Sequence, residues 1–134
     1  MRMMLPLIVA TLMANASFAT ALPPLREVKE IDDGLFAVAV ADEIRKECPS
    51  ISARMFRALS YINALENRAR DLGYSKEEIK AYVDSKAEKA RMRARGEAYL
   101  KANGVSYAAP ETFCALGKSE IVKATRIGQL LRAK

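Results

Sequence analysis

The sequence predicts an all-α protein: a small bundle of four to five helices that follows a cleaved signal peptide and is held by one disulfide. Three observations predict this fold class. Apolar residues recur at alternating steps of four and three between Ile51 and Leu72, which is the spacing of one helix face. Ser75-Lys76-Glu77-Glu78 is a capping box, the signature of a helix start. The stretch from Leu35 to Ala41 also fits a buried strand, but no second strand candidate is present to pair with it.

Residues 1–21 have the pattern of an export signal. Met1-Arg2 is a basic start, Met3 to Met13 is apolar, and Ala19-Thr20-Ala21 has the small side chains that signal peptidase selects. The apolar segment has about 11 residues, whereas a membrane-spanning helix needs about 20. We therefore expect cleavage after Ala19 or Ala21, a periplasmic location, and no transmembrane segment in the mature chain.

The mature chain is predicted to begin with an extended arm over residues 22–32, because Pro23 and Pro24 exclude a helix interior. A helical domain over residues 33–134 follows. Asp32 or Asp33 is expected to cap its first helix, since a helix N-terminus favours a carboxylate. This helix is expected to reach Glu47, because Asp42 to Lys46 contains no turn signal.

The second helix is predicted to bury one apolar face, which Phe56 and Leu59 widen toward the core, and to end at Gly73. The residues of that face are Ile51, Met55, Ala58, Ile62, Leu65, Ala69 and Leu72.

The third helix is predicted to run from Ser75 to about Ala102 and to turn a thin face toward its neighbours, formed by Ile79, Val83, Ala87, Ala90, Ala94 and Ala98. A short helix over residues 111–116 is then expected to stop at Gly117. Ser119 is expected to cap the last helix.

Cys48 and Cys114 are the two cysteines of the chain. An even number of cysteines in an exported chain indicates a disulfide, here between the end of the first helix and the segment before the last one. Such a bond stabilises by about 4 kcal/mol in the chain-entropy model. Two buried free thiols are the alternative, and the absence of a C-x-x-C motif argues against a redox-active pair.

The sequence contains no catalytic or cofactor signature. It has no histidine, which excludes the Ser-His and Cys-His pairs of hydrolases and removes the commonest zinc ligand. Its six glycines form no phosphate-binding loop. The acidic pairs Asp42-Glu43 and Glu77-Glu78 fit ordinary helix surfaces. We therefore predict no enzymatic activity, no metal site and no cofactor.

A basic ridge on the third helix is the candidate interaction site. Its cations outnumber the acids Glu88 and Glu97, and spacings of four residues place them in two adjacent rows. The ridge consists of Lys86, Lys89, Arg91, Arg93, Arg95 and Lys101. It fits an acidic protein face or an anionic lipid surface, whereas nucleic acid is not expected outside the cytoplasm. The alternative is a solvated helix face whose arginine stems cover apolar surface.

The mature chain resembles a family of small uncharacterised exported proteins of alphaproteobacteria of the Rhodobacter and Paracoccus group. The resemblance covers residues 25–131 and rests on five segments: IDDGLF (31–36), ADEIR (41–45), LGYS (72–75), KAEKARMRARGE (86–97) and FCALG (113–117). It implies a Gram-negative periplasm. Some relatives are encoded near genes for the respiratory NADH dehydrogenase, which implies an accessory role on a respiratory membrane complex.

These patterns favour a non-enzymatic interaction protein that binds a protein partner in the periplasm or on the outer face of the membrane. A periplasmic acid-stress chaperone is the alternative, because a loosely packed bundle opens when its carboxylates lose charge. A protein that binds anionic lipid surfaces is a weaker alternative.

Overall fold

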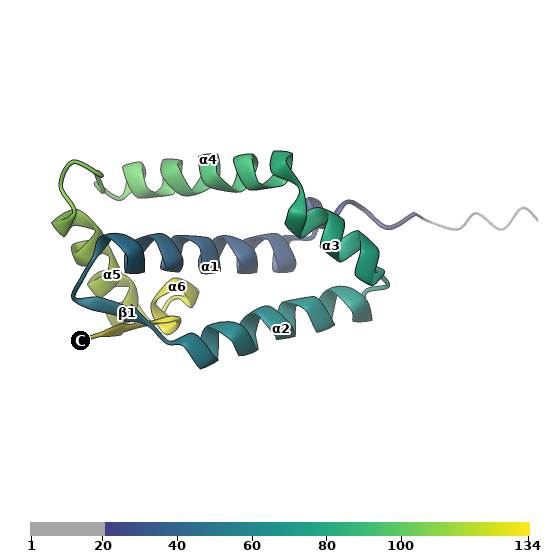
Figure 1. Ribbon diagram of the computed structural model, residues 1–134, viewed down its shortest axis with the longest axis horizontal. Coiled ribbons are helices and arrows are strands. Elements are labelled where there is room, and N and C mark those ends of the chain that lie inside the picture. The colour runs from purple at the N-terminus through teal and green to yellow at the C-terminus, as the bar shows by residue number, and fades with distance from the viewer. Residues whose placement is uncertain (1–20) are drawn as a thin grey trace, which may run out of the picture.

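Helix α1 lies between two other helices, with α4 along one side and α2 along the other (Figure 1). The computed structural model describes residues 21–134. Helix α3 connects α2 to α4 at one end of the molecule, and α5, α6 and two short strands form the opposite end. The elements are η1 (Leu25–Glu27), α1 (Lys29–Glu47), β1 (Ile51–Ala53), α2 (Met55–Asp71), α3 (Lys76–Asp84), α4 (Lys86–Ala102), α5 (Glu111–Lys123), α6 (Arg126–Gln129) and β2 (Leu131–Ala133).

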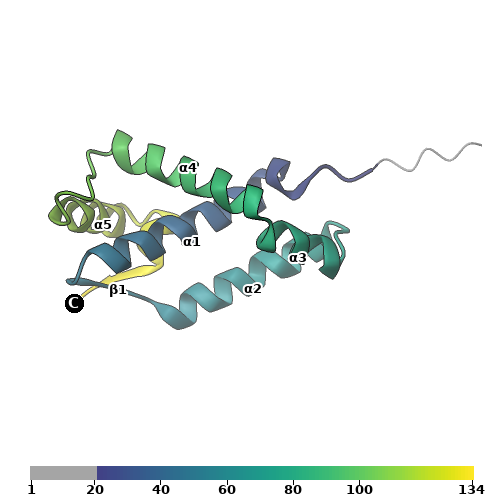
Figure 2. The ribbon, with the colours of Figure 1, turned by 45° about the horizontal axis from the view of Figure 1, so that its top comes forward.

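The expected all-α class is confirmed, with the addition of a small antiparallel sheet. Ile51 pairs with Ala133 and Ala53 with Leu131, so β2 returns the C-terminus to the segment that precedes α2 (Figure 2). The apolar spacing predicted Ile51 on the second helix, which is wrong, because Ile51 begins β1. Three-residue strands are too short to show the alternation that identifies strands in a sequence.

The core lies where α1 meets α5, α6 and the sheet. Ile44 of α1 and Phe113 of α5 are fully buried and belong to one apolar cluster with Val40 and Leu130. The predicted disulfide is confirmed. Cys48 and Cys114 are bonded, with their Cα atoms 5.2 Å apart, and they join the end of α1 to α5.

Gly117 lies inside α5 and does not interrupt it, contrary to the expectation from the sequence. A Cβ atom at this position would lie 2.4 Å from Ile51 Cδ1 and 2.9 Å from Ile44 Cγ2. The glycine therefore lets α5 approach β1 and α1 closely. Ser119 consequently caps no helix. The last helix, α6, is capped by Thr125, whose Oγ1 accepts a hydrogen bond from the amide of Gly128.

The predicted capping box at Ser75 is confirmed, since Ser75 Oγ accepts from the amide of Glu78 at 3.1 Å. The helix that follows is shorter than expected and ends at Asp84. Ser85 starts α4 in the same way, with its Oγ accepting from the amide of Glu88 at 3.2 Å. Ser85-Lys86-Ala87-Glu88 thus repeats the serine–glutamate spacing of the first box.

The N-terminal arm is shorter than the predicted residues 22–32. Leu25–Glu27 form a 3₁₀ turn and α1 begins at Lys29, so Asp32 lies inside the helix and caps nothing. The expected signal peptide lies outside the described residues, apart from Ala21. Over residues 21–134, no helix combines the length and the apolar character that a membrane crossing requires.

Candidate functional site

Asp32 connects α1 to both α3 and α4. Its side chain is only 8% exposed. Arg91 donates to it through Nη2 at 2.5 Å and Nη1 at 3.2 Å, and Arg95 donates through Nη1 at 3.1 Å. Tyr82 of α3 donates a further hydrogen bond through its hydroxyl. Because Arg91 and Arg95 lie one turn apart on α4, both guanidinium groups reach the same carboxylate.

Further ion pairs extend the cluster from Arg95 to Asp33 and from Arg91 to Glu88. Arg95 Nη2 lies 2.7 Å from Asp33, which also pairs with Lys29. Arg91 Nε lies 2.8 Å from Glu88 Oε2, and Glu88 also accepts from Arg26 at 3.3 Å. This cluster therefore ties η1, α1, α3 and α4 together.

The pKa of the Asp32 carboxyl is lowered from 3.8. Burial acts in the opposite direction and is the largest single effect, but the hydrogen bonds from Arg91 and Tyr82 and the positive charges of both arginines together outweigh it. The hydrogen bond from Arg95 likewise lowers the pKa of Asp33. Burial and the neighbouring Asp32 raise the pKa of Tyr82 well above 10.0. At neutral pH the cluster holds an ionised Asp32 and a neutral tyrosine.

The predicted basic ridge is therefore divided between two faces of α4. Arg91 and Arg95 face α1, where Arg95 also stacks at 4.0 Å over the Phe36 ring. The expected alanine face points the other way, because Ala87, Ala90, Ala94 and Ala98 are all exposed. Arginine stems and aromatic rings thus take the place of small apolar side chains at the α1–α4 contact.

The other four ridge cations, Lys86, Lys89, Arg93 and Lys101, are exposed and form no ion pair within residues 21–134. Lys89 and Arg93 line a groove of about 280 Å³ between α1 and α4, which we call the α1–α4 groove. Its apolar lining consists of Ala39, Val40, Met92, Leu100 and the ring of Tyr107.

The acids of α1 beside this groove already have partners. Asp42 pairs with Arg45 at 2.6 Å and with Lys46 at 3.0 Å. Glu43 accepts a hydrogen bond from the hydroxyl of Tyr107 at 2.9 Å. On the α4 wall, Lys89 and Arg93 carry two positive charges and Glu97 carries one negative charge. None of these three side chains forms an ion pair among the described residues. The groove therefore has an apolar floor, an α4 wall with a net positive charge from Lys89, Arg93 and Glu97, and an α1 wall on which Glu43 keeps its negative charge.

A second groove, of about 360 Å³, lies on the α2 side of α1. Its walls are almost entirely apolar, and they include Leu35, Val38, Met55, Leu59 and Ile62. The beginning of α2 was predicted to turn Phe56 and Leu59 into the core, which is wrong: Phe56 is 89% exposed and Leu59 is 51% exposed. Only Leu65 and Ala69 of α2 are buried, because the helix contacts η1 and α1 mainly through its second half.

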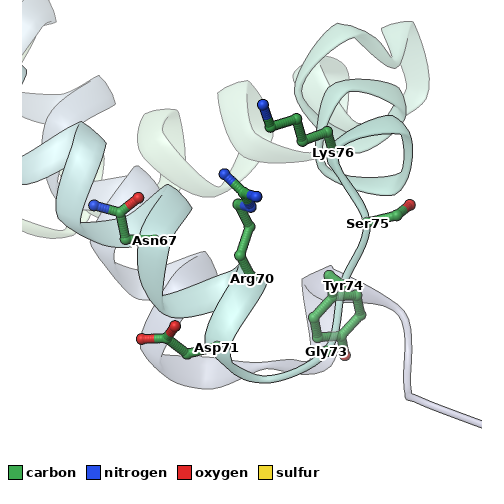
Figure 3. A pocket seen from close by; sticks show the side chains of 7 residues that line it. All are labelled: Asn67, Arg70, Asp71, Gly73, Tyr74, Ser75 and Lys76. Atoms are coloured by element: carbon green, nitrogen blue, oxygen red, sulfur yellow. The ribbon is translucent and has the colours of Figure 1, made fainter.

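A third hollow, of about 490 Å³, lies at the connection between α2 and α3 (Figure 3). Arg70 and Lys76 extend over it, and Asp71 lies on the far side of the turn. Tyr74 is 6% exposed, and its hydroxyl donates to the carbonyl of Pro23. This hydrogen bond and the burial of Leu25 hold the N-terminal arm against the helices.

The buried acids of the described chain have structural partners. Glu120 of α5 is 5% exposed and accepts hydrogen bonds from the hydroxyls of Tyr99 and Thr125. Burial and this contact raise the pKa of Tyr99 to about 12. Within residues 21–134 no three acidic or cysteine side chains are placed to hold a metal ion.

Residues 23–132 match the model of a family described as a family of unknown function (DUF5333). The chain belongs to this family. The matched range begins at Pro23, whose carbonyl accepts a hydrogen bond from Tyr74, and ends at Arg132 in β2, so it covers all but a few of the residues that the structure describes. No curated protein and no solved structure matches the chain.

Proposed function

We propose that the protein is an exported, non-enzymatic interaction module whose α1–α4 groove binds an acidic segment of a partner protein. Residues 1–21 and the Cys48–Cys114 disulfide support export to the periplasm. The observation that carries the docking role is the pairing pattern on α4. Arg91 and Arg95 pair with α1, whereas Lys89 and Arg93 form no ion pair with residues 21–134 and lie beside an apolar floor.

An apolar centre with a charged rim is typical of protein–protein interfaces. The net positive wall favours a partner segment that carries Asp or Glu beside its apolar residues. The outer face of a respiratory membrane complex is the location that we propose for this partner, on the basis of the family resemblance.

The test is affinity capture from detergent-solubilised membranes with the protein and the variant Lys89→Glu/Arg93→Glu. We expect the protein to retain a stoichiometric membrane partner and the variant to lose it, because the acidic segment would then meet like charge. Lys118→Glu/Lys123→Glu, which reverses two exposed charges on α5, is the matched control and should retain the partner. Equal capture by both variants, or no partner with any of them, contradicts the docking role.

An acid-stress chaperone is the second candidate, and the Asp32 cluster is the observation that favours it. Protonation of Asp32 removes the charge that holds α4 against α1, which would uncover the apolar surface between them. Because the pKa of Asp32 is lowered in the fold, this release is expected only below its ordinary value of 3.8. Light scattering of an aggregating client protein at about pH 2–3 tests the idea, and undiminished scattering in the presence of the oxidised protein contradicts it.

A further inference from the structure

The first turns of α2 carry three large apolar side chains in solvent. Phe56 is 89% exposed, Met55 is 54% exposed and Leu59 is 51% exposed. We call these residues the α2 tip. They lie beside the wide apolar groove between α1 and α2, which Met55 and Leu59 also line. An apolar patch of this kind on a small domain marks a contact surface.

Two arginines flank Met55 and Phe56 at the start of α2, and two more lie on α6 and β2, the elements that contact this part of the chain. Arg54 and Arg57 belong to the start of α2, and their side chains donate to the carbonyls of Leu131 and Gln129, respectively. Arg126 of α6 stacks at 4.6 Å over Tyr61 of α2, and Arg132 extends from β2. None of these arginines forms an ion pair with any residue of the described chain.

The backbone at the start of α2 is positive as well. Its N-cap residue, Arg54, supplies no side-chain acceptor to the free amides, and the first turn contains no acidic residue. The first acid of the helix is Glu66, which lies beyond the α2 tip. The partial positive charge of the helix end is therefore uncompensated and adds to the charge of the arginines.

We propose that the α2 tip docks on an anionic lipid bilayer. Phe56, Met55 and Leu59 enter the boundary between headgroups and acyl chains. The arginines and the open N-terminus of α2 contact lipid phosphates.

Exposed aromatic and aliphatic side chains flanked by cations have the chemistry of interfacial membrane segments. A second copy of this chain fits the surface poorly, because a symmetric contact would bring the same arginines against one another. The sequence-predicted lipid surface on α4 is a different place, since α1 lies between α4 and α2 (Figures 1 and 2). The inference goes beyond the proposed docking role and uses none of the groove residues on α4.

The experiment is co-sedimentation of the full chain with phosphatidylcholine vesicles that contain about one-third phosphatidylglycerol. The variant Phe56→Ser is compared with Val122→Ser, because Val122 is 86% exposed on α5. Residues 1–20 are identical in both variants. We expect Phe56→Ser to weaken vesicle binding by about tenfold or more, as the loss of one inserted phenylalanine requires, and Val122→Ser to leave it unchanged. Arg57→Glu should weaken binding too, and a rise in salt from about 0.05 to 0.5 M should weaken it for the unmodified chain.

A fluorescent reporter identifies the inserted residue directly. The chain contains no tryptophan, so Phe56→Trp and Val122→Trp each create a single probe. We expect a blue shift of the emission for Phe56→Trp on anionic vesicles, none for Val122→Trp, and neither shift on pure phosphatidylcholine. Binding that Phe56→Ser leaves intact, or emission at position 56 that stays unshifted, overturns the proposal. So does an α2 tip that binds an acidic protein but no vesicle.

The two proposals fail separately. Lys89→Glu/Arg93→Glu should still bind vesicles if the α2 tip is the lipid contact. Phe56→Ser should still capture a solubilised partner if the α1–α4 groove is the protein contact.

Discussion

Asp32 brings three helices together through one carboxylate. It accepts from Arg91, Arg95 and Tyr82, whereas Asp42, three turns later on the same helix, pairs only with α1 residues. Burial opposes the shift in both cases, but hydrogen bonds and positive charges lower the pKa of both carboxyls, from other helices for Asp32 and from its own helix for Asp42. Only Asp32 holds separate elements against each other, so the two positions form a natural pair for comparison.

We expect Asp32→Asn to lower the free energy of unfolding by about 2–4 kcal/mol, because two arginines lose their buried counter-charge. Asp42→Asn should cost at most about 1 kcal/mol, as is usual for exposed pairs within one helix. Urea unfolding followed by far-UV circular dichroism measures both values. Equal losses for the two variants would show that Asp32 plays no special role.

Two glycines inside helices provide a second comparison at this scale. We expect Gly117→Ala to destabilise by about 1–3 kcal/mol, because the new methyl group overlaps Ile51 and Ile44. Gly96 has no atom within 4 Å of an added Cβ, so Gly96→Ala should stabilise by about 0.5–1 kcal/mol through its helix propensity. Thermal unfolding of the two variants should move in opposite directions.

At the scale of elements, a helix start was predictable where a capping box marked it and was missed at α1, α2, α4 and α6. Ser75 and its glutamate act locally, so the sequence alone identified that cap. The equivalent capping box at Ser85 was not recognised, because the apolar spacing from Ile79 to Ala98 predicted one uninterrupted helix across this position. Periodicity marks one side of α4 but not which side is buried, and here arginine stems and Tyr99 bind α1 while alanines face solvent.

The candidate site shows the same limit. The sequence identified the six cations of the ridge but not which of them form ion pairs. Arg91 and Arg95 pair with Asp32 inside α1, and this pairing could not be predicted because the helix was expected to begin at Asp33. The exposed tip of α2 was also missed, because Met55 fits the predicted apolar face and Leu59 widens it, whereas only Leu65 and Ala69 of α2 are buried. The absence of acids from Arg54 to Leu65 was the available signal.

We expect Ser85→Ala to destabilise by about 1 kcal/mol, because the amide of Glu88 loses its acceptor at the start of α4. Ser60→Ala, an exposed position within α2, should change stability by less than about 0.5 kcal/mol. Hydrogen exchange of the α4 amides should rise in Ser85→Ala alone. Unchanged exchange would mean that packing, and not the cap, sets the beginning of α4.

The whole molecule combines a tightly packed end with a polar one. Ile44, Phe113 and the disulfide lie at the end formed by α5 and the sheet. Towards η1 and α3, charge pairs around Asp32 supply much of the contact between elements. The response of the molecule to acid should therefore begin at the polar end.

We expect the free energy of unfolding to stay level above about pH 5 and to fall as the pH drops below 3.8, the ordinary pKa of Asp32. The sign follows from the lowered pKa: the unfolded chain takes up the proton first, so acid favours unfolding. In Asp32→Asn the fall should be smaller, because one of the responsible carboxyls is absent. Denaturant titrations across this range measure the difference, and identical pH curves would exclude Asp32 as a contributor.

The Cys48–Cys114 bond encloses α2, α3 and α4 within one covalent ring that starts and finishes at the tightly packed end. Helices that leave α1 in acid therefore remain tethered near it, and their effective concentration stays high. On return to neutral pH these helices therefore dock again from a short distance. In the reduced chain only the backbone joins them to α1 and α5, so they explore a larger volume and their effective concentration near α1 falls.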